Sequence, residues 1–264
     1  MTTILALKLL LVPALIAGIT LAGRRWGPSV AGWLSAFPVV SAPVLFFIAL
    51  EQGPAFATTA TTATLSAVLA ILVFGISYCW VSLRYRWPVC LVISLLAYAL
   101  AVGLLNAWHA PLGTAAGLVL AALLLAPRLY PQAPASVAPA RSSRGDLLWR
   151  MLAGAVLVLT VTGFATQLGA RLSGLLAMFP VMATVLAVFS QRLAGAGFTV
   201  RLLRGMVYGY WAFACFCLSL ALALPRLPLS AAFALALGIA TGVQALTRLR
   251  LSRPALTAGS AGRA

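Results

Sequence analysis

The sequence predicts an all-α polytopic membrane protein, with about nine transmembrane helices in two inverted-topology repeats of four helices joined by one extra span. The first reason is composition: 63% of the residues are hydrophobic and 8% are charged, whereas a soluble domain carries roughly 25% charged residues. The second is that apolar runs long enough to cross a bilayer core recur along the chain. The third is a motif that occurs twice.

The apolar runs give the order of the elements. The first run lacks a charged segment in front of it, so we interpret it as a span rather than as a cleavable signal peptide. The fifth run is short and lies between Pro111 and Pro127, and its alternative interpretation is a re-entrant or interfacial segment. In chain order the predicted spans are residues 4–22, 29–50, 58–82, 88–107, 111–127, 147–166, 173–190, 204–224 and 229–247.

The basic residues test the number of spans. With nine spans, 15 of the 18 Lys and Arg residues fall on one side of the membrane, and only Lys8, Arg171 and Arg226 fall on the other. If the fifth run did not cross, the split would be 12 to 6. Because basic residues accumulate in cytoplasmic loops, the distribution predicts nine spans, an outside N-terminus and a cytoplasmic C-terminus.

The repeated motif indicates a tandem duplication. Residues 27–39 return as residues 169–181, 142 positions later, with two glycines, a leucine and a Phe-Pro-Val at the same spacing. The match extends upstream to Lys8 and Arg150 and downstream to Gly53 and Gly195. The two copies of the motif lie in the second and seventh predicted spans, which are five spans apart. Because this number is odd, the second copy is predicted to be inverted relative to the first.

The duplication sets the predicted division of the chain. The segment between the halves is rich in Pro, Ala, Ser and Arg, which is typical of a disordered linker. The predicted parts are membrane repeat 1 (1–110), a connecting span (111–127), a cytoplasmic linker (128–146), membrane repeat 2 (147–248) and a disordered cytoplasmic tail (249–264).

Two prolines point to a candidate site. Pro38 and Pro180 fall near the middle of the second and seventh predicted spans, where proline removes a backbone donor and interrupts the helix. Broken helices at matching places in inverted halves are typical of a midplane transport site. The alternative is a packing kink without a ligand. The candidate substrate-binding residues are Ser35, Phe37, Pro38, Ser41, Phe179, Pro180 and Thr184.

Two charged residues and a threonine cluster are further candidates. Glu51 and Lys8 are expected to form an ion pair at the outer interface. Otherwise Lys8 extends its amine to that interface, and Glu51 couples protons or cations. Three threonines that share a helix face, at positions 58, 61 and 64, predict interhelical hydrogen bonding or tight packing, with a hydroxyl-lined path as the alternative.

Other functions find no residues to support them. The net charge of +16 does not require a nucleic-acid partner, because basic residues between the spans set the orientation of a membrane protein. The four cysteines lack metal-ligand spacing with a histidine, and the sequence has no Ser-His-Asp set, metal-ligand cluster or phosphate-binding loop. We therefore predict no catalytic residues, metal or cofactor, and no enzymatic activity.

A resemblance adds a cellular location. Ala31-Gly32-Trp-Leu34-Ser-Ala-Phe37-Pro38 and its copy Ser173-Gly174-Leu-Leu176-Ala-Met-Phe179-Pro180 resemble the GlpM-like family of small bacterial inner-membrane proteins. This chain differs in being doubled and fused, and it lacks a further proline expected shortly before Phe-Pro. The resemblance implies a bacterial inner (plasma) membrane protein and a unit that pairs with an inverted copy, and it implies no established activity.

The function predicted on these grounds is a small-solute or ion transporter or permease that rocks one repeat against the other around the two broken helices. The alternative is a non-transporting membrane scaffold or envelope-homeostasis protein whose duplication serves packing only. The expected partners are the lipid bilayer and a small solute or ion. A homo-oligomer is left open.

Overall fold

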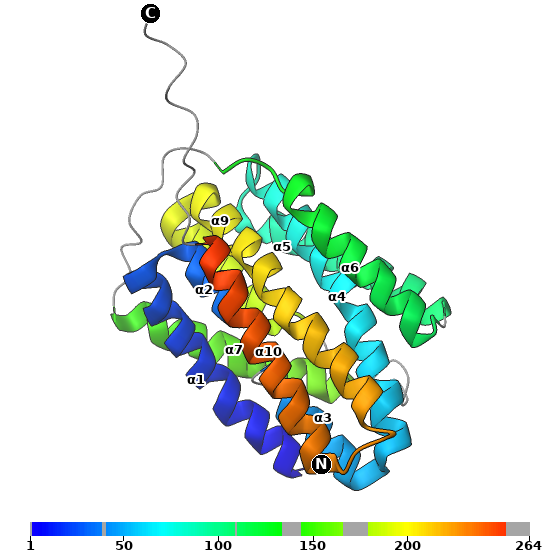
Figure 1. The fold of residues 1–264 in the computed structure, drawn as a ribbon. Coiled ribbons are helices and arrows are strands. Elements are labelled where there is room, and N and C mark those ends of the chain that lie inside the picture. Colours follow the sequence, from blue (N-terminus) through cyan, green and yellow to red (C-terminus); the bar gives the residue numbers. More distant parts are fainter. Residues whose placement is uncertain (1, 39–40, 109, 134–143, 166–178, 252–264) are drawn as a thin grey trace, which may run out of the picture.

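A computed structural model describes residues 2–38, 41–108, 110–133, 144–165 and 179–251. Over these ranges the chain forms α-helices and no strand, and the longer helices pack alongside one another as a bundle (Figure 1). The helices are α1 (Thr2–Trp26), α2 (Pro28–Ser35), α3 (Ser41–Gln52), α4 (Pro54–Ser82), α5 (Trp87–Ala107), α6 (Leu112–Leu129), α7 (Arg144–Ala165), α9 (Val181–Ala223) and α10 (Leu229–Leu251).

The helices have the length and composition of a membrane protein. Among the described residues, five helices are long and apolar enough to cross a bilayer: α4, α5, α6, α9 and α10. α6 is the predicted fifth span, and its 18 helical residues reach the length that a crossing needs. The prediction of a helical, multi-pass membrane protein is therefore confirmed, while nine spans and the orientation of the termini stay predictions.

The predicted second span is interrupted where the sequence places Pro38. α2 ends at Ser35 and α3 begins at Ser41, so residues 29–50 form two short helices rather than one. Proline has no backbone N–H and clashes with the carbonyl group four residues before it. The helix restarts beyond the proline, where the N–H of Ala42 donates to the carbonyl oxygen of Pro38 at 2.9 Å.

Two glycines turn the chain between helices in the same way. Gly53 precedes α4 with φ 87° and ψ 167°, and Gly195 interrupts α9 with φ 78° and ψ 179°. This combination of angles is essentially restricted to glycine, because a Cβ atom collides with the backbone there. α9 is therefore a shorter helix up to Ala194 followed by a long one, and the turning glycines lie 142 positions apart.

The backbones of α2 and α9 pack close together. A Cβ atom at Gly32 would collide with the carbonyl group of Leu202, and one at Gly205 would collide with the backbone of Ser29. Small residues let helix backbones touch, which matters in a membrane because lipid supplies little hydrophobic drive for helices to associate. Gly32 therefore serves close helix packing. Gly174, its counterpart, lies outside the described residues.

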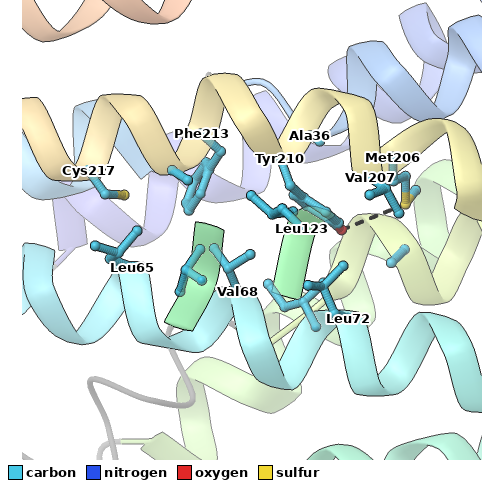
Figure 2. Close-up of a cluster of buried hydrophobic side chains, with 14 of the residues drawn as sticks. Ala36, Leu65, Val68, Leu72, Leu123, Met206, Val207, Tyr210, Phe213 and Cys217 are labelled. Atoms are coloured by element: carbon cyan, nitrogen blue, oxygen red, sulfur yellow. Dashed lines mark hydrogen bonds between the residues drawn. The ribbon is translucent and has the colours of Figure 1, made fainter. Parts of the chain in front are cut away.

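The core lies between α4, α6 and α9. Figure 2 shows the side chains of Leu65, Val68 and Leu72 on α4 facing those of Tyr210 and other residues on α9. Leu65 and Val68 are at most 1% exposed. Such interdigitated packing gains dispersion energy that lipid tails, with looser contacts, do not match. The outer faces of α5 and α6 instead carry exposed leucines, as expected of helices that border lipid.

Candidate functional site

The end of α2 shows how the proline-broken helix is stabilised. A helix end leaves its last carbonyl groups without intrahelical donors, and in lipid each of them needs another partner. The hydroxyl of Ser35 donates to the Gly32 carbonyl oxygen at 2.7 Å, and the Phe37 N–H donates to that of Leu34 at 3.2 Å. The carbonyl oxygen of Trp33 accepts a hydrogen bond from the Gln244 side-chain amide at 2.9 Å.

α10 holds this end of α2 through two side chains. Besides the amide of Gln244, the hydroxyl of Thr247 takes part, accepting a hydrogen bond from the indole N–H of Trp33 at 2.9 Å. The same hydroxyl donates to the carbonyl oxygen of Gln244 at 3.0 Å. The side-chain oxygen of Gln244 is buried and has no hydrogen-bond partner among the described residues. Within the described ranges, the side-chain oxygen of Gln244 is therefore an unpaired hydrogen-bond acceptor beside the break.

The second candidate position, at Pro180, has different surroundings at the start of α9, and residues 166–178 before it lie outside the described residues. Pro180 directly precedes α9, and its carbonyl oxygen accepts from the Thr184 N–H at 2.8 Å. The ring of Phe179 packs edge-on against Tyr98 of α5, with ring centroids 5.6 Å apart. The hydroxyl groups of Tyr98 and Thr184 are buried without a hydrogen-bond partner in the part of the chain that the structure describes. The start of α9 thus lies close to buried hydroxyls that have no partner among the described residues, as expected of a ligand site.

The structure places the predicted substrate-binding residues in two groups. Ser35, Phe37, Pro38 and Ser41 surround the α2–α3 break, whereas Phe179, Pro180 and Thr184 surround the start of α9. Within the described ranges, no hydrogen bond or ring contact joins one group to the other. Ser35 already donates its hydroxyl within α2, so its role here is to cap the helix. The Thr184 hydroxyl, in contrast, has no hydrogen-bond partner among the described residues.

The other predicted residues have more local roles. Glu51 is exposed near the end of α3, and the Lys8 side chain lies outside the described residues, so their ion pair stays a prediction. Thr58 and Thr61 donate to carbonyl oxygens of their own helix, at 2.9 and 2.7 Å. Interhelical hydrogen bonding is therefore wrong for this pair. Tight packing accounts for Thr61, which is fully buried.

A polar cluster around Gln191 escapes sequence analysis. Its side-chain oxygen accepts from the Tyr78 hydroxyl at 2.9 Å, and its amide donates to the Tyr85 carbonyl oxygen at 2.9 Å. The amide also lies 3.5 Å from the sulfur of Cys90. These bonds join the first part of α9 to α4 and to the turn before α5. No sequence signal identifies the cluster, because its members lie about a hundred residues apart.

Comparisons with known proteins do not identify a function for this chain. No family model, curated protein or solved structure matches the chain. Among the described residues there is no group of three or more His, Cys, Asp or Glu side chains able to hold a metal ion.

Proposed function

We propose that this chain is a small-solute or ion transporter or permease of the bacterial inner membrane, built on a duplicated GlpM-like unit. The observation that carries the proposal is the start of α9, where the Thr184 and Tyr98 hydroxyls are buried near Phe179 and Pro180 without a hydrogen-bond partner among the described residues. Interrupted helices with polar groups at membrane depth are the usual site of solute binding in secondary transporters.

The helix boundaries support the proposed inverted repeat. α5 begins at Trp87 and α10 at Leu229, which are 142 positions apart, like the repeated motif. The turning glycines Gly53 and Gly195 have the same spacing. α5 packs on α4 as α10 packs on the second part of α9, so equivalent helices have equivalent neighbours. Two units with one architecture would supply the two bodies that rock against each other.

The proposal requires water to reach the breaks, which cysteine labelling measures. The four native cysteines are replaced by alanine, and single cysteines are introduced at Ser35, Ser41 and Thr184. Reaction with a membrane-impermeant thiol reagent at Thr184 and Ser41 is expected. Gln52→Cys, exposed at the end of α3 on the predicted outer side, is the reactive control. Leu96→Cys, at a side chain 66% exposed on the outer face of α5, is the control protected by lipid.

Complete protection of all three positions would contradict a transport site and favour the membrane scaffold. Reporter fusions near Ala110, Ala135 and the C-terminus test the topology separately. Ala110 is expected outside, and the other two positions inside. If Ala110 and Ala135 reported the same side, the halves would run parallel and the rocking mechanism would lose its basis. Solute uptake into proteoliposomes then tests transport itself.

A further inference from the structure

A cavity lies between α1, α2, α7 and α9, away from the uncompensated hydroxyls of the Pro180 break. Its volume is about 30 Å³, far below the range of about 300–1,000 Å³ typical of sites for drug-sized ligands, so only a small ligand or chemical group can enter. The apolar part of its wall includes Ala31 of α2 and Leu186 of α9. Arg24 also lines the cavity and is exposed, so the cavity reaches the surface on that side.

Two residues that line the cavity carry buried hydroxyl groups without a partner among the described residues. Thr20 of α1 and Ser190 of α9 are 7% and 2% exposed, and both hydroxyls are buried without a hydrogen-bond partner in the described part of the chain. Other buried hydroxyls behave differently, since those of Thr61 and Ser94 donate to the carbonyl group four residues before them. Leaving a buried polar group unpaired costs free energy. A ligand that forms hydrogen bonds with both hydroxyls would remove this cost and bind more tightly.

The cavity is also positively charged. Arg150 of α7 lines it and is only 5% exposed. Its guanidinium carbon lies 5.4 Å from the ring centroid of Phe189. Arg150 has a further interaction as well, so the argument depends on its charge and position rather than on a vacant side chain. Arg24 adds a second positive charge. Among the described residues that line the cavity there is no carboxylate, and the chain has 18 basic residues against two acidic ones.

We propose that this cavity binds a phosphate-type oxyanion, either inorganic phosphate or the phosphate group of an anionic lipid. Guanidinium groups match the geometry of phosphate oxygens and keep their charge at any physiological pH. Serine and threonine hydroxyls can donate hydrogen bonds to the phosphate oxygens that the arginines do not bind. Both arginines belong to the predicted cytoplasmic side, where anionic lipid is concentrated. Binding here does not depend on the transport activity proposed above.

The test is the thermal stability of the purified protein in detergent, because a ligand that binds only the folded state raises Tm. Sodium phosphate is titrated against sodium chloride at equal ionic strength. In separate samples, mixed micelles with phosphatidylglycerol are compared with micelles that contain phosphatidylcholine. A saturable rise in Tm of several degrees is expected with phosphate, with phosphatidylglycerol or with both, and none is expected with chloride or phosphatidylcholine.

The decisive variant is Thr20→Val combined with Ser190→Ala. Because neither hydroxyl has a partner in the part of the chain that the structure describes, Tm without ligand should stay unchanged or rise, while the ligand-induced rise should be lost. The matched control, Thr61→Val with Ser94→Ala, also removes two buried hydroxyls and should keep the ligand-induced rise. Arg150→Gln should abolish binding as well, and the double variant keeps the test valid if Arg150→Gln does not fold.

The two ligand sources give different results. If phosphatidylglycerol raises Tm and removes the effect of phosphate, the occupant is a lipid headgroup. If phosphate acts and phosphatidylglycerol does not, the occupant is the free anion. The proposal is overturned if neither ligand raises Tm, or if the Thr20→Val, Ser190→Ala variant responds like the parent protein.

Discussion

The amide of Gln244 donates a hydrogen bond to the carbonyl oxygen of Trp33 at 2.9 Å, across 211 residues of sequence. The acceptor belongs to the last turn of α2, where the helix supplies no donor because the chain breaks before Pro38. One side chain of α10 thus compensates for a helix end that membrane lipid leaves without a partner.

Gln244→Leu should therefore destabilise the protein. Truncating the amide leaves a buried carbonyl group unpaired, at a cost of about 1–3 kcal/mol in the free energy of unfolding. Denaturation in detergent, followed by helical circular dichroism, measures the change. Thr241→Val, at an exposed position of the same helix, is the control and should change stability by less than about 0.5 kcal/mol. A Gln244→Leu protein as stable as its parent would contradict this role.

Alanine at Gly32 should separate α2 from α9. A Cβ atom there collides with backbone atoms of Leu202, which cannot rotate away, so a loss of about 1–3 kcal/mol or more is expected. Gly18→Ala on α1 is the matched control, because no atom lies within 4 Å of its added Cβ. That substitution should stabilise the helix by up to about 1 kcal/mol. Thermal unfolding of both variants measures whether stability falls at Gly32 and rises at Gly18. Equal changes in stability would argue against close packing.

The turns at Gly53 and Gly195 should be equally sensitive to substitution. Both have positive φ, and neither has an atom within 4 Å of an added Cβ, so the cost of alanine comes from the backbone alone. About 1–3 kcal/mol is expected at each position. Gly103→Ala, equally open but in α5, should not destabilise. Unfolding measurements that found only one turn sensitive would show that the turns differ in importance.

Tyr78→Phe should weaken the contact between α4 and α9. The Tyr78 hydroxyl donates to the side-chain oxygen of Gln191 at 2.9 Å, and losing this bond costs about 0.5–1.5 kcal/mol. Tyr98→Phe is the control, since its hydroxyl has no partner among the described residues and its loss should be neutral or stabilising. Chemical denaturation of the two variants compares them directly, and equal losses would mean that the effect belongs to packing.

The features that the sequence predicts correctly are local ones. Pro38 interrupts a helix because of its own ring, so the break could be read at that position without knowledge of the fold. The eighth span, predicted from residue 204, begins earlier, because the second part of α9 follows Gly195 directly. Arg201 and Arg204 lie within this helix, which continues through both because arginine is a good helix former.

The features that the sequence misses are contacts between distant segments. Nothing in the sequence around Gln244 or Gln191 indicates which carbonyl or hydroxyl group each amide meets. The hydroxyls of Thr20 and Ser190 are equally hidden, because a membrane helix offers most serines and threonines a carbonyl group in its preceding turn. That these hydroxyls lack such a bond emerges only from the packed helices.

The bond between Gln244 and Trp33 also sets a constraint on biosynthesis. A ribosome adds about 5–20 residues per second, so the 211 residues between the two take roughly 10–40 s to make. During that interval the nascent α2 already carries its broken end, but the side chain that will compensate for it has not been translated. The segment must therefore wait beside water, headgroups or an insertion factor, and enter its final depth only when α10 arrives.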